Sequence, residues 1–232
     1  MVSSDSLTGC ANYHARIRFD DAGIQTWLLR VPRVTGFAVS FPVPLAEYLI
    51  RSEYATLILL ETPAVPAPRA FSFGIPSQGA DHGVGVCFLL MEELPGKPWD
   101  GRGDPAKIWS GLAGIYAELG KHPFSKAGSL SVERIDDPPL VSAVASDRFV
   151  CLDPYDPFDS AATYYARLGR ALYPQFPANA YLVYLFLRDG ASATILFDDS
   201  SDNNEFFLRH VDDKGDHLLV DGDCNITGII DW

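Results

Sequence analysis

The stretch FFLRHVDDKGDHLLVDGDCNITGIIDW, residues 206–232, has two groups of carboxylates separated by a short apolar run, and Asp231 follows a second apolar run. The runs HLLVD and NITGIID are typical of two β-strands, and the segment DGDC between them is typical of a hairpin turn. An acidic hairpin turn is most often simply solvated. Whether these carboxylates also carry out chemistry depends on the segments that precede them.

The composition is that of a folded protein with an acidic surface. Of the 232 residues, 47% are hydrophobic and 12% are aromatic, which is enough for one large core or two smaller ones. Acidic residues outnumber basic residues by 30 to 18, and the formal net charge is −12. Attraction to a nucleic-acid backbone or to an anionic membrane is therefore disfavoured, and we expect neither among the partners.

The four cysteines, Cys10, Cys87, Cys151 and Cys224, form no C-x-x-C pair and no close cluster typical of a zinc site or a disulfide framework. The N-terminus lacks the basic start and apolar run of a signal peptide. The longest apolar run, AYLVYLFL, is much shorter than the roughly 20 residues that a membrane-spanning helix needs. We expect a soluble, cytoplasmic protein, and the sequence does not indicate its oligomeric state.

Proline and glycine divide the first part of the chain into strand and helix patterns. HARIRF (14–19) and WLLRVP (27–32) predict two strands joined by the turn-rich segment DDAGIQ. LAEYLIRSEYATLILL (45–60) has apolar residues at helical spacing and predicts an amphipathic helix. GVGVCFLLMEEL (83–94) predicts a buried strand that ends at the proline-bounded corner EELPGKPW.

This corner is the expected boundary between a lobe of residues 1–94 and a second lobe of residues 95–232. The second lobe begins with Asp104 as a helix cap and with Pro105 at the first helical position, so DPAKIWSGLAGIYAELGKH predicts a helix. DSAATYYARLGRALY predicts another helix. NAYLVYLFLRDG fits either a third helix or, by periodicity alone, a buried strand.

The order of these segments resembles the aminoglycoside phosphotransferase family, in particular its fungal branch, within the protein-kinase-like fold. TGCANYHARIRF is similar to the hairpin that covers the phosphates, WLLRVP to the third strand, RSEYATLILL to the helix with the ion-pair glutamate, and FLLMEELPGKPW to the strand and hinge around adenine. The most specific segments are HVDDKGDH, which is similar to the catalytic loop, and GIIDW. The resemblance implies a bilobal α+β fold, with an antiparallel sheet and a helix in the N-lobe and a mainly helical, incomplete C-lobe.

The last two segments carry the residues implied in phosphoryl transfer, a reaction that demands mainly positioning and charge neutralisation. The resemblance implies that Asp212 orients the acceptor hydroxyl and takes its proton, and that Asp231 binds the metal ion, Mg²⁺ or Mn²⁺, that bridges the ATP phosphates. Lys214 is a second catalytic candidate that could reach the transferring phosphate. His210 is expected to brace the catalytic loop.

The nucleotide-binding residues that the resemblance implies lie in the first lobe. Glu53 is expected to pair with Arg30, where protein kinases use lysine, although Glu53 on its own could equally be an exposed charge beside Arg51. Gly9 stands in the loop expected to cover the phosphates. Adenine is expected to contact backbone groups of the hinge residues Glu92, Glu93 and Leu94.

Two features depart from the family pattern. His217 stands where the family has the asparagine that completes metal coordination, and imidazole is a poor ligand for Mg²⁺. We keep His217 as a candidate metal ligand. The chain also ends one residue after Asp231, where the family continues with helices, so we expect this sequence to be a fragment.

The sequence therefore predicts an ATP-dependent phosphotransferase whose partners are a nucleotide and a small-molecule acceptor with a hydroxyl group. Fold-level analogy does not identify the acceptor. The alternative, suggested by His217 and the missing helices, is a nucleotide-binding module with weak or no activity that acts through protein contacts.

Overall fold

The computed structural model describes residues 2–3, 12–19, 26–33, 43–62, 64–79, 83–144, 157–161, 163–164, 182, 185–186, 189, 205–210 and 217–232. The chain forms two compact units. The larger unit consists of Met1–His122, Leu130–Leu140 and Leu208–Trp232, and the smaller unit consists of Pro123–Ser129 and Val141–Phe207. The candidate site lies within the larger unit.

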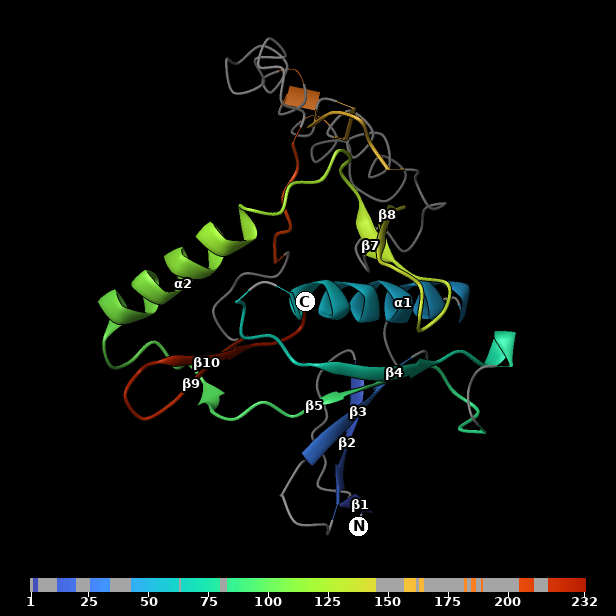
Figure 1. The fold of residues 1–232 in the computed structure, drawn as a ribbon, viewed down its shortest axis with the longest axis horizontal. Coiled ribbons are helices and arrows are strands. Elements are labelled where there is room, and N and C mark those ends of the chain that lie inside the picture. Colours follow the sequence, from blue (N-terminus) through green and yellow to red (C-terminus); the bar gives the residue numbers. More distant parts are fainter. Residues whose placement is uncertain are drawn as a thin grey trace. The chain divides into compact units, whose positions relative to one another are not determined.

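The larger unit contains a five-stranded antiparallel sheet in the order β1-β2-β3-β5-β4 (Figure 1). Its strands are β1 (Val2–Ser3), β2 (Asn12–Arg18), β3 (Thr26–Pro32), β4 (Ala70–Gly74) and β5 (Phe88–Glu92). The predicted strand pair is confirmed as β2 and β3, with Arg16 opposite Leu28 and His14 opposite Arg30. β5 pairs with β3 on one side and with β4 on the other.

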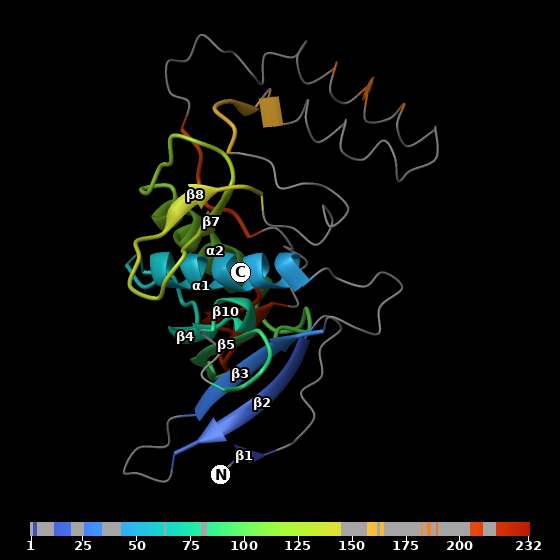
Figure 2. The ribbon, with the colours of Figure 1, turned by 90° about the vertical axis from the view of Figure 1, so that its right-hand side faces the viewer.

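One face of this sheet packs against helix α1 (Val43–Leu60), which confirms the predicted amphipathic helix (Figure 2). Of the apolar residues of α1 that recur at helical spacing, Ile50, Tyr54, Leu57 and Leu60 are buried, and Leu45 and Leu49 are half-buried. The ring of Tyr54 lies 4.8 Å from the ring of Phe73 on β4, centroid to centroid. These contacts fix α1 against the sheet face that also carries the candidate site.

Helix α2 (Pro105–Leu119) begins and ends as predicted. The Asp104 carboxylate accepts hydrogen bonds from the backbone N–H groups of Ala106 and Lys107, at 3.1 Å and 3.2 Å, and caps the first turn. The helix buries a single stripe of apolar residues. That stripe packs with residues from the end of α1, the segment after it and the C-terminal hairpin in one core, which consists of Leu60, Val65, Ile108, Leu112, Ile115, Leu119, Leu218 and Ile229.

The predicted C-terminal hairpin is confirmed as β9 (Leu218–Val220) and β10 (Ile226–Ile229). Its turn is organised by the Asp221 carboxylate, which accepts hydrogen bonds from the backbone N–H groups of Asp223 at 2.9 Å and Asn225 at 2.8 Å. The side chain of Asn225 also donates to Asp221 at 2.7 Å, and these bonds lower the pKa of Asp221 below its ordinary value. The carboxylate of Asp221 therefore stabilises the turn through these hydrogen bonds.

A third strand, β6 (Lys97–Pro98), pairs with β9, so the segment that follows β5 lies along the hairpin. Thr227 Oγ1 donates to the carbonyl oxygen of Pro95 at 2.6 Å. Gly96 has φ +115, and a Cβ atom there would lie 2.3 Å from Thr227 Oγ1 and 3.0 Å from the backbone oxygen of Val220. The close approach of the two segments therefore depends on glycine at this position.

We expect Gly96→Ala to lower the free energy of unfolding by about 2 kcal/mol, because alanine is strained at positive φ and its Cβ would push the hairpin away. Gly101→Ala is the matched control, since Gly101 has φ +81 but a Cβ atom there would have nothing within 4 Å. Urea unfolding gives the loss of stability for each variant. The loss in Gly101→Ala reports the strain of positive φ alone, and the additional loss in Gly96→Ala reports the clash with the hairpin. Equal losses in both variants would show that the segment after β5 is not held against the hairpin.

The remaining elements are short. The 3₁₀ helix η1 (Pro76–Gln78) follows β4, and β7 (Ser129–Ser131) pairs with β8 (Leu140–Ser142). Within the smaller unit, Phe124 forms an isolated antiparallel β-bridge with Phe206, and Ala127 forms another with Phe158.

The α+β class is confirmed, whereas α1 and α2 are the only complete α-helices that the described residues contain. The helices predicted over 159–173 and 179–190 lie mostly outside those residues, so a mainly helical second lobe stays a prediction. Of the helices in the described part of the chain, none combines the length and the apolar character that crossing a membrane requires.

Candidate functional site

The candidate site is centred on Arg30, which lies between two carboxylates. Its Nη1 atom donates to Glu53 Oε1 at 2.5 Å and to Asp231 Oδ1 at 2.9 Å. The Arg30 and Glu53 side chains are each 13% exposed, whereas the Asp231 side chain is 57% exposed. The predicted contact between Glu53 and Arg30 is confirmed, and their role in nucleotide binding stays a prediction.

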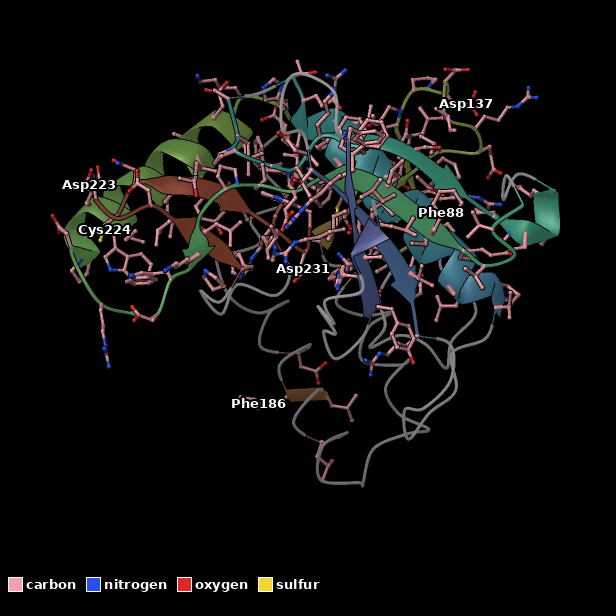
Figure 3. The ribbon with its side chains drawn as sticks, turned by 90° about the horizontal axis from the view of Figure 1, so that it is seen from below. Phe88, Asp137, Phe186, Asp223, Cys224 and Asp231 are labelled. Carbon is pink, nitrogen blue, oxygen red and sulfur yellow. The ribbon has the colours of Figure 1, made fainter. Side chains whose placement is uncertain are left out.

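Three separate elements bring these residues together. Arg30 lies on β3 opposite Leu89 of β5, which is fully buried, so its side chain shares the face that packs against α1. Glu53 is three residues after the buried Ile50 on α1 and therefore faces the same side of that helix. Asp231 follows β10, and Figure 3 shows it at the opposite end of the hairpin from Asp223. The carboxylates of the turn are thus separate from the site.

Among the residues that the structure describes, the charges of the site are unbalanced, because the Arg30 cation contacts two anions, Glu53 and Asp231. Removal from water raises the pKa of Glu53 above its ordinary value of 4.5, Arg30 opposes this rise, and the charge of Asp231 adds to it. With Arg30 shared, the three side chains carry a net charge of −1 when both carboxylates are ionised. Such a group attracts a further cation to its exposed side, where Asp231 lies.

We expect Glu53→Gln to remove one part of the pH dependence of stability. Since the folded-state pKa of Glu53 lies above 4.5, the stabilisation linked to its proton is fully present below that pH and is lost as the pH rises through the folded-state pKa. Urea unfolding of both proteins between about pH 4 and pH 8 measures this effect. The wild type should lose stability relative to the variant as the pH rises. A constant difference between the two proteins would contradict the raised pKa.

The backbone at Asp231 is in an uncommon conformation, with φ +63. A residue other than glycine in the left-handed region costs about 1 kcal/mol or more, and such strain persists where the surroundings hold it in place. Here the preceding N–H of Ile230 donates to the carbonyl oxygen of His217 at 3.0 Å, and Trp232 Nε1 donates to the carbonyl oxygen of Ile229 at 2.9 Å. These bonds hold the chain on both sides of Asp231, whose side chain contacts Arg30.

His210 and His217 form a stacked pair next to this segment. Their ring centroids are 4.0 Å apart with an interplanar angle of 14°, and the residues are 3% and 5% exposed. His210 Nε2 is hydrogen-bonded to the carbonyl oxygen of Ile230 at 2.9 Å, one residue before Asp231. This contact agrees with the expected bracing role of His210, which stays a prediction.

The sequence predicts His217 as a metal ligand, and the structure shows its ring buried against His210. Nitrogen is also the wrong donor type for Mg²⁺, whereas the exposed carboxylate of Asp231 is a suitable one. Among the residues that the structure describes, no three His, Cys, Asp or Glu side chains are close enough together to hold a metal ion. The metal-ligand roles of Asp231 and His217 stay predictions.

The hinge residues begin where β5 ends. The N–H of Glu92 donates to the carbonyl oxygen of Arg69 at 2.8 Å, and the N–H of Glu93 donates to the carbonyl oxygen of Thr26 at 3.2 Å. Both N–H groups are therefore used within the protein. The structure shows no hydrogen bond to the Leu94 backbone from any residue it describes. Of the three predicted hinge residues, Leu94 thus has the N–H group that could contact adenine.

Three predicted site residues, Gly9, Asp212 and Lys214, lie outside the described residues. Their roles, and the prediction that Asp212 and Asp231 face one cleft, stay predictions. The sequence did not reveal the contact between Arg30 and Asp231, which are 201 positions apart. It also did not reveal an ion pair between Arg16 and Glu93, because no local pattern links strand β2 to the hinge.

A sequence model of the phosphotransferase enzyme family (APH) matches residues 12–232. No curated protein matches the chain. Among solved structures, a putative aminoglycoside phosphotransferase from Ralstonia eutropha JMP134 is 20% identical, with a TM-score of 0.38, over 53% of this chain and 33% of that chain. The Rio2 kinase–ADP/Mg²⁺–phosphoaspartate complex from Chaetomium thermophilum is 15% identical, with a TM-score of 0.39, over 63% of this chain and 47% of that chain. The match thus covers less than half the length of either solved structure.

Proposed function

Because the chain belongs to the phosphotransferase enzyme family, we propose that it transfers the γ-phosphate of ATP to a hydroxyl group of a small molecule. The observation that carries this proposal is the pair of contacts that Arg30 makes with Glu53 and Asp231. The guanidinium of Arg30, which can bind phosphate, lies beside the carboxylate of Asp231, which can bind a metal ion. Phosphoryl transfer relies on this combination of charges.

Arg30 and Asp231 are the residues that would hold the phosphates and their metal ion. A guanidinium group binds phosphate through a planar fork of N–H donors. Arriving phosphate oxygens would compete with Asp231 for Arg30, and the released carboxylate would then be available to Mg²⁺ or Mn²⁺. Glu53 would keep Arg30 in position from the buried side of the site. When bound, the metal ion neutralises charge on the phosphates.

Asp212 is the proposed base, with Lys214 as a further catalytic candidate in the same loop. A carboxylate in this role accepts the proton of the acceptor hydroxyl and orients its oxygen toward the γ-phosphate. Gly9 would cover the phosphates, and the hinge would contact adenine through Leu94. The small-molecule nature of the acceptor is inferred from the resemblance.

Several further features belong to the same proposal. They are the division into lobes at residues 94 and 95, the mainly helical second lobe, the fungal branch of the family and a cytoplasmic location.

Two measurements test the proposal. Calorimetric titration with ATP should show binding that becomes tighter when Mg²⁺ is added. Incubation with γ-labelled ATP and a panel of small hydroxyl compounds should then give a labelled product. Binding without transfer to any compound of the panel would favour the alternative, a nucleotide-binding module with weak or no activity. Absence of ATP binding with either Mg²⁺ or Mn²⁺ would contradict both.

A further inference from the structure

A second arginine, Arg16, connects strand β2 to the hinge. Its Nε atom donates to Glu93 Oε1 at 2.6 Å, across 77 positions of sequence. The two side chains are 27% and 26% exposed, so the pair is partly shielded from water. No pattern in the sequence and no resemblance to the family points to this arginine.

Arg16 lies on the same sheet face as Arg30. In the register of β2 and β3, Arg16 is opposite Leu28, and directly opposed residues of an antiparallel pair point to the same side. Leu28 is two residues before Arg30 on β3, so the side chains of Leu28 and Arg30 share a face. Arg16 and Arg30 therefore share one face of the sheet, and each of them contacts a carboxylate.

The two ion pairs lie at opposite ends of the proposed nucleotide site. Arg30 contacts Asp231, the proposed metal ligand, and therefore marks the phosphate end. Arg16 contacts Glu93, in the hinge, and therefore marks the end where the base would lie. Along a strand, two residues span about 7 Å, so the two arginines are positioned to act on different parts of one ligand.

The hinge is anchored on both sides of Leu94. On one side, the Glu93 N–H bonds to Thr26 and the Glu93 carboxylate bonds to Arg16. On the other side, the carbonyl of Pro95 accepts a hydrogen bond from Thr227 of the hairpin. Leu94 lies between these anchors, and the described residues provide no hydrogen-bond partner for its backbone. The anchors leave this backbone available to a ligand.

We propose that Arg16 is a positioning residue of the nucleotide site, which acts through Glu93 to hold the Leu94 backbone in place for the base of ATP. This inference rests on the proposed function. A partly exposed ion pair with no such role would contribute little to stability. Its removal would change the affinity for ligands at both ends of the site equally. The positioning role instead predicts a loss confined to the base.

The test compares ligands that occupy different ends of the site. Dissociation constants of ATP, adenosine and inorganic tripolyphosphate, each with Mg²⁺, are measured for the wild type and for Arg16→Gln and Glu93→Gln. We expect both variants to bind ATP and adenosine roughly three- to fivefold more weakly, with tripolyphosphate unchanged. The double variant Arg16→Glu, Glu93→Arg, which restores an ion pair with exchanged charges, should recover part of the loss.

Arg102→Gln is the matched control, because Arg102 is 90% exposed, pairs with Asp100 at 3.8 Å and lies outside the site. It should bind all three ligands as the wild type does. If Arg16→Gln does not fold, Glu93→Gln removes the same ion pair and carries the test. Two results would overturn this inference alone, provided that the wild type binds ATP. Either both variants bind ATP as tightly as the wild type does, or their affinities for adenosine and for tripolyphosphate fall by the same factor. A wild type that does not bind ATP overturns the proposed function as well.

Discussion

Replacement of Asp212 by asparagine is expected to slow phosphate transfer by a factor of roughly 10² to 10⁴, which is the usual contribution of a general base. Asparagine has nearly the same shape as aspartate but cannot accept the proton of the acceptor hydroxyl. ATP binding should be nearly unchanged, because this proposal gives Asp212 no contact with the metal ion or the nucleotide. Initial rates with γ-labelled ATP and calorimetric ATP titration measure the two effects separately.

Asp213→Asn is the matched control, since it removes the same charge from the neighbouring position. Its transfer rate should remain close to that of the wild type. Unaltered turnover in the Asp212 variant would show that Asp212 is not the base. Equal losses in both variants would show that the loop needs its negative charge and not one particular carboxylate.

Replacement of Arg30 by methionine is expected to lower the free energy of unfolding by about 3 kcal/mol. Methionine retains much of the length of the side chain but leaves the Glu53 carboxylate, which is 13% exposed, without the cation that it contacts. The Asp231 carboxylate loses the same partner. ATP affinity should also fall, because the proposed phosphate ligand is absent. Urea unfolding and ATP titration of the purified variant measure both effects.

Adding Glu53→Gln to this variant should recover part of the stability, because the buried charge is then removed together with its partner. Arg69→Met is a matched control for the loss of an exposed pair. Arg69 lies 3.8 Å from Glu61, and their side chains are 66% and 37% exposed. Arg69→Met should lower the free energy of unfolding by less than about 1 kcal/mol. Similar losses for Arg30→Met and Arg69→Met would mean that Arg30 does not stabilise the fold through Glu53.

Local chemistry made much of the fold predictable. Asp104 followed by Pro105 is a helix start that depends on neighbouring residues alone, and α2 begins there. The apolar spacing of residues 45–60 determines which side of α1 is buried, and that side packs against the sheet. The C-terminal hairpin follows from two apolar runs around a polar turn. Each of these features is encoded within a few turns or strand positions.

The contacts of the site were harder to predict, because they join residues that are distant in sequence. The family resemblance suggested that Glu53 pairs with Arg30, but the register of β3 and the rotation of α1 determine the actual contact. The link to Asp231 also requires the hairpin to lie beside the sheet. The interaction of Arg16 with Glu93 depends instead on the strand order of the sheet, in which β3 lies between β2 and β5. None of these contacts leaves a periodic signal in the sequence.

The acidic stretch at residues 206–232 contains carboxylates with separate roles. Asp221 stabilises the turn of the hairpin through its hydrogen bonds, as an acidic turn most often does. Asp231 lies at the other end of the hairpin (Figure 3). It contacts Arg30. Sequence spacing alone could not separate these roles, since each residue follows an apolar strand, Asp221 after β9 and Asp231 after β10. The structure separates them by the direction of β10.

The most direct test of the account is the dependence of ATP affinity on Mg²⁺ in the wild type and in Asp231→Asn. Asparagine tolerates the left-handed backbone of this position, so the substitution removes the charge with little added strain. Calorimetry should show that Mg²⁺ tightens ATP binding to the wild type and that this gain is lost in the variant. An equal gain from Mg²⁺ in both proteins would contradict the assignment of Asp231 as the metal ligand, and with it the proposed site.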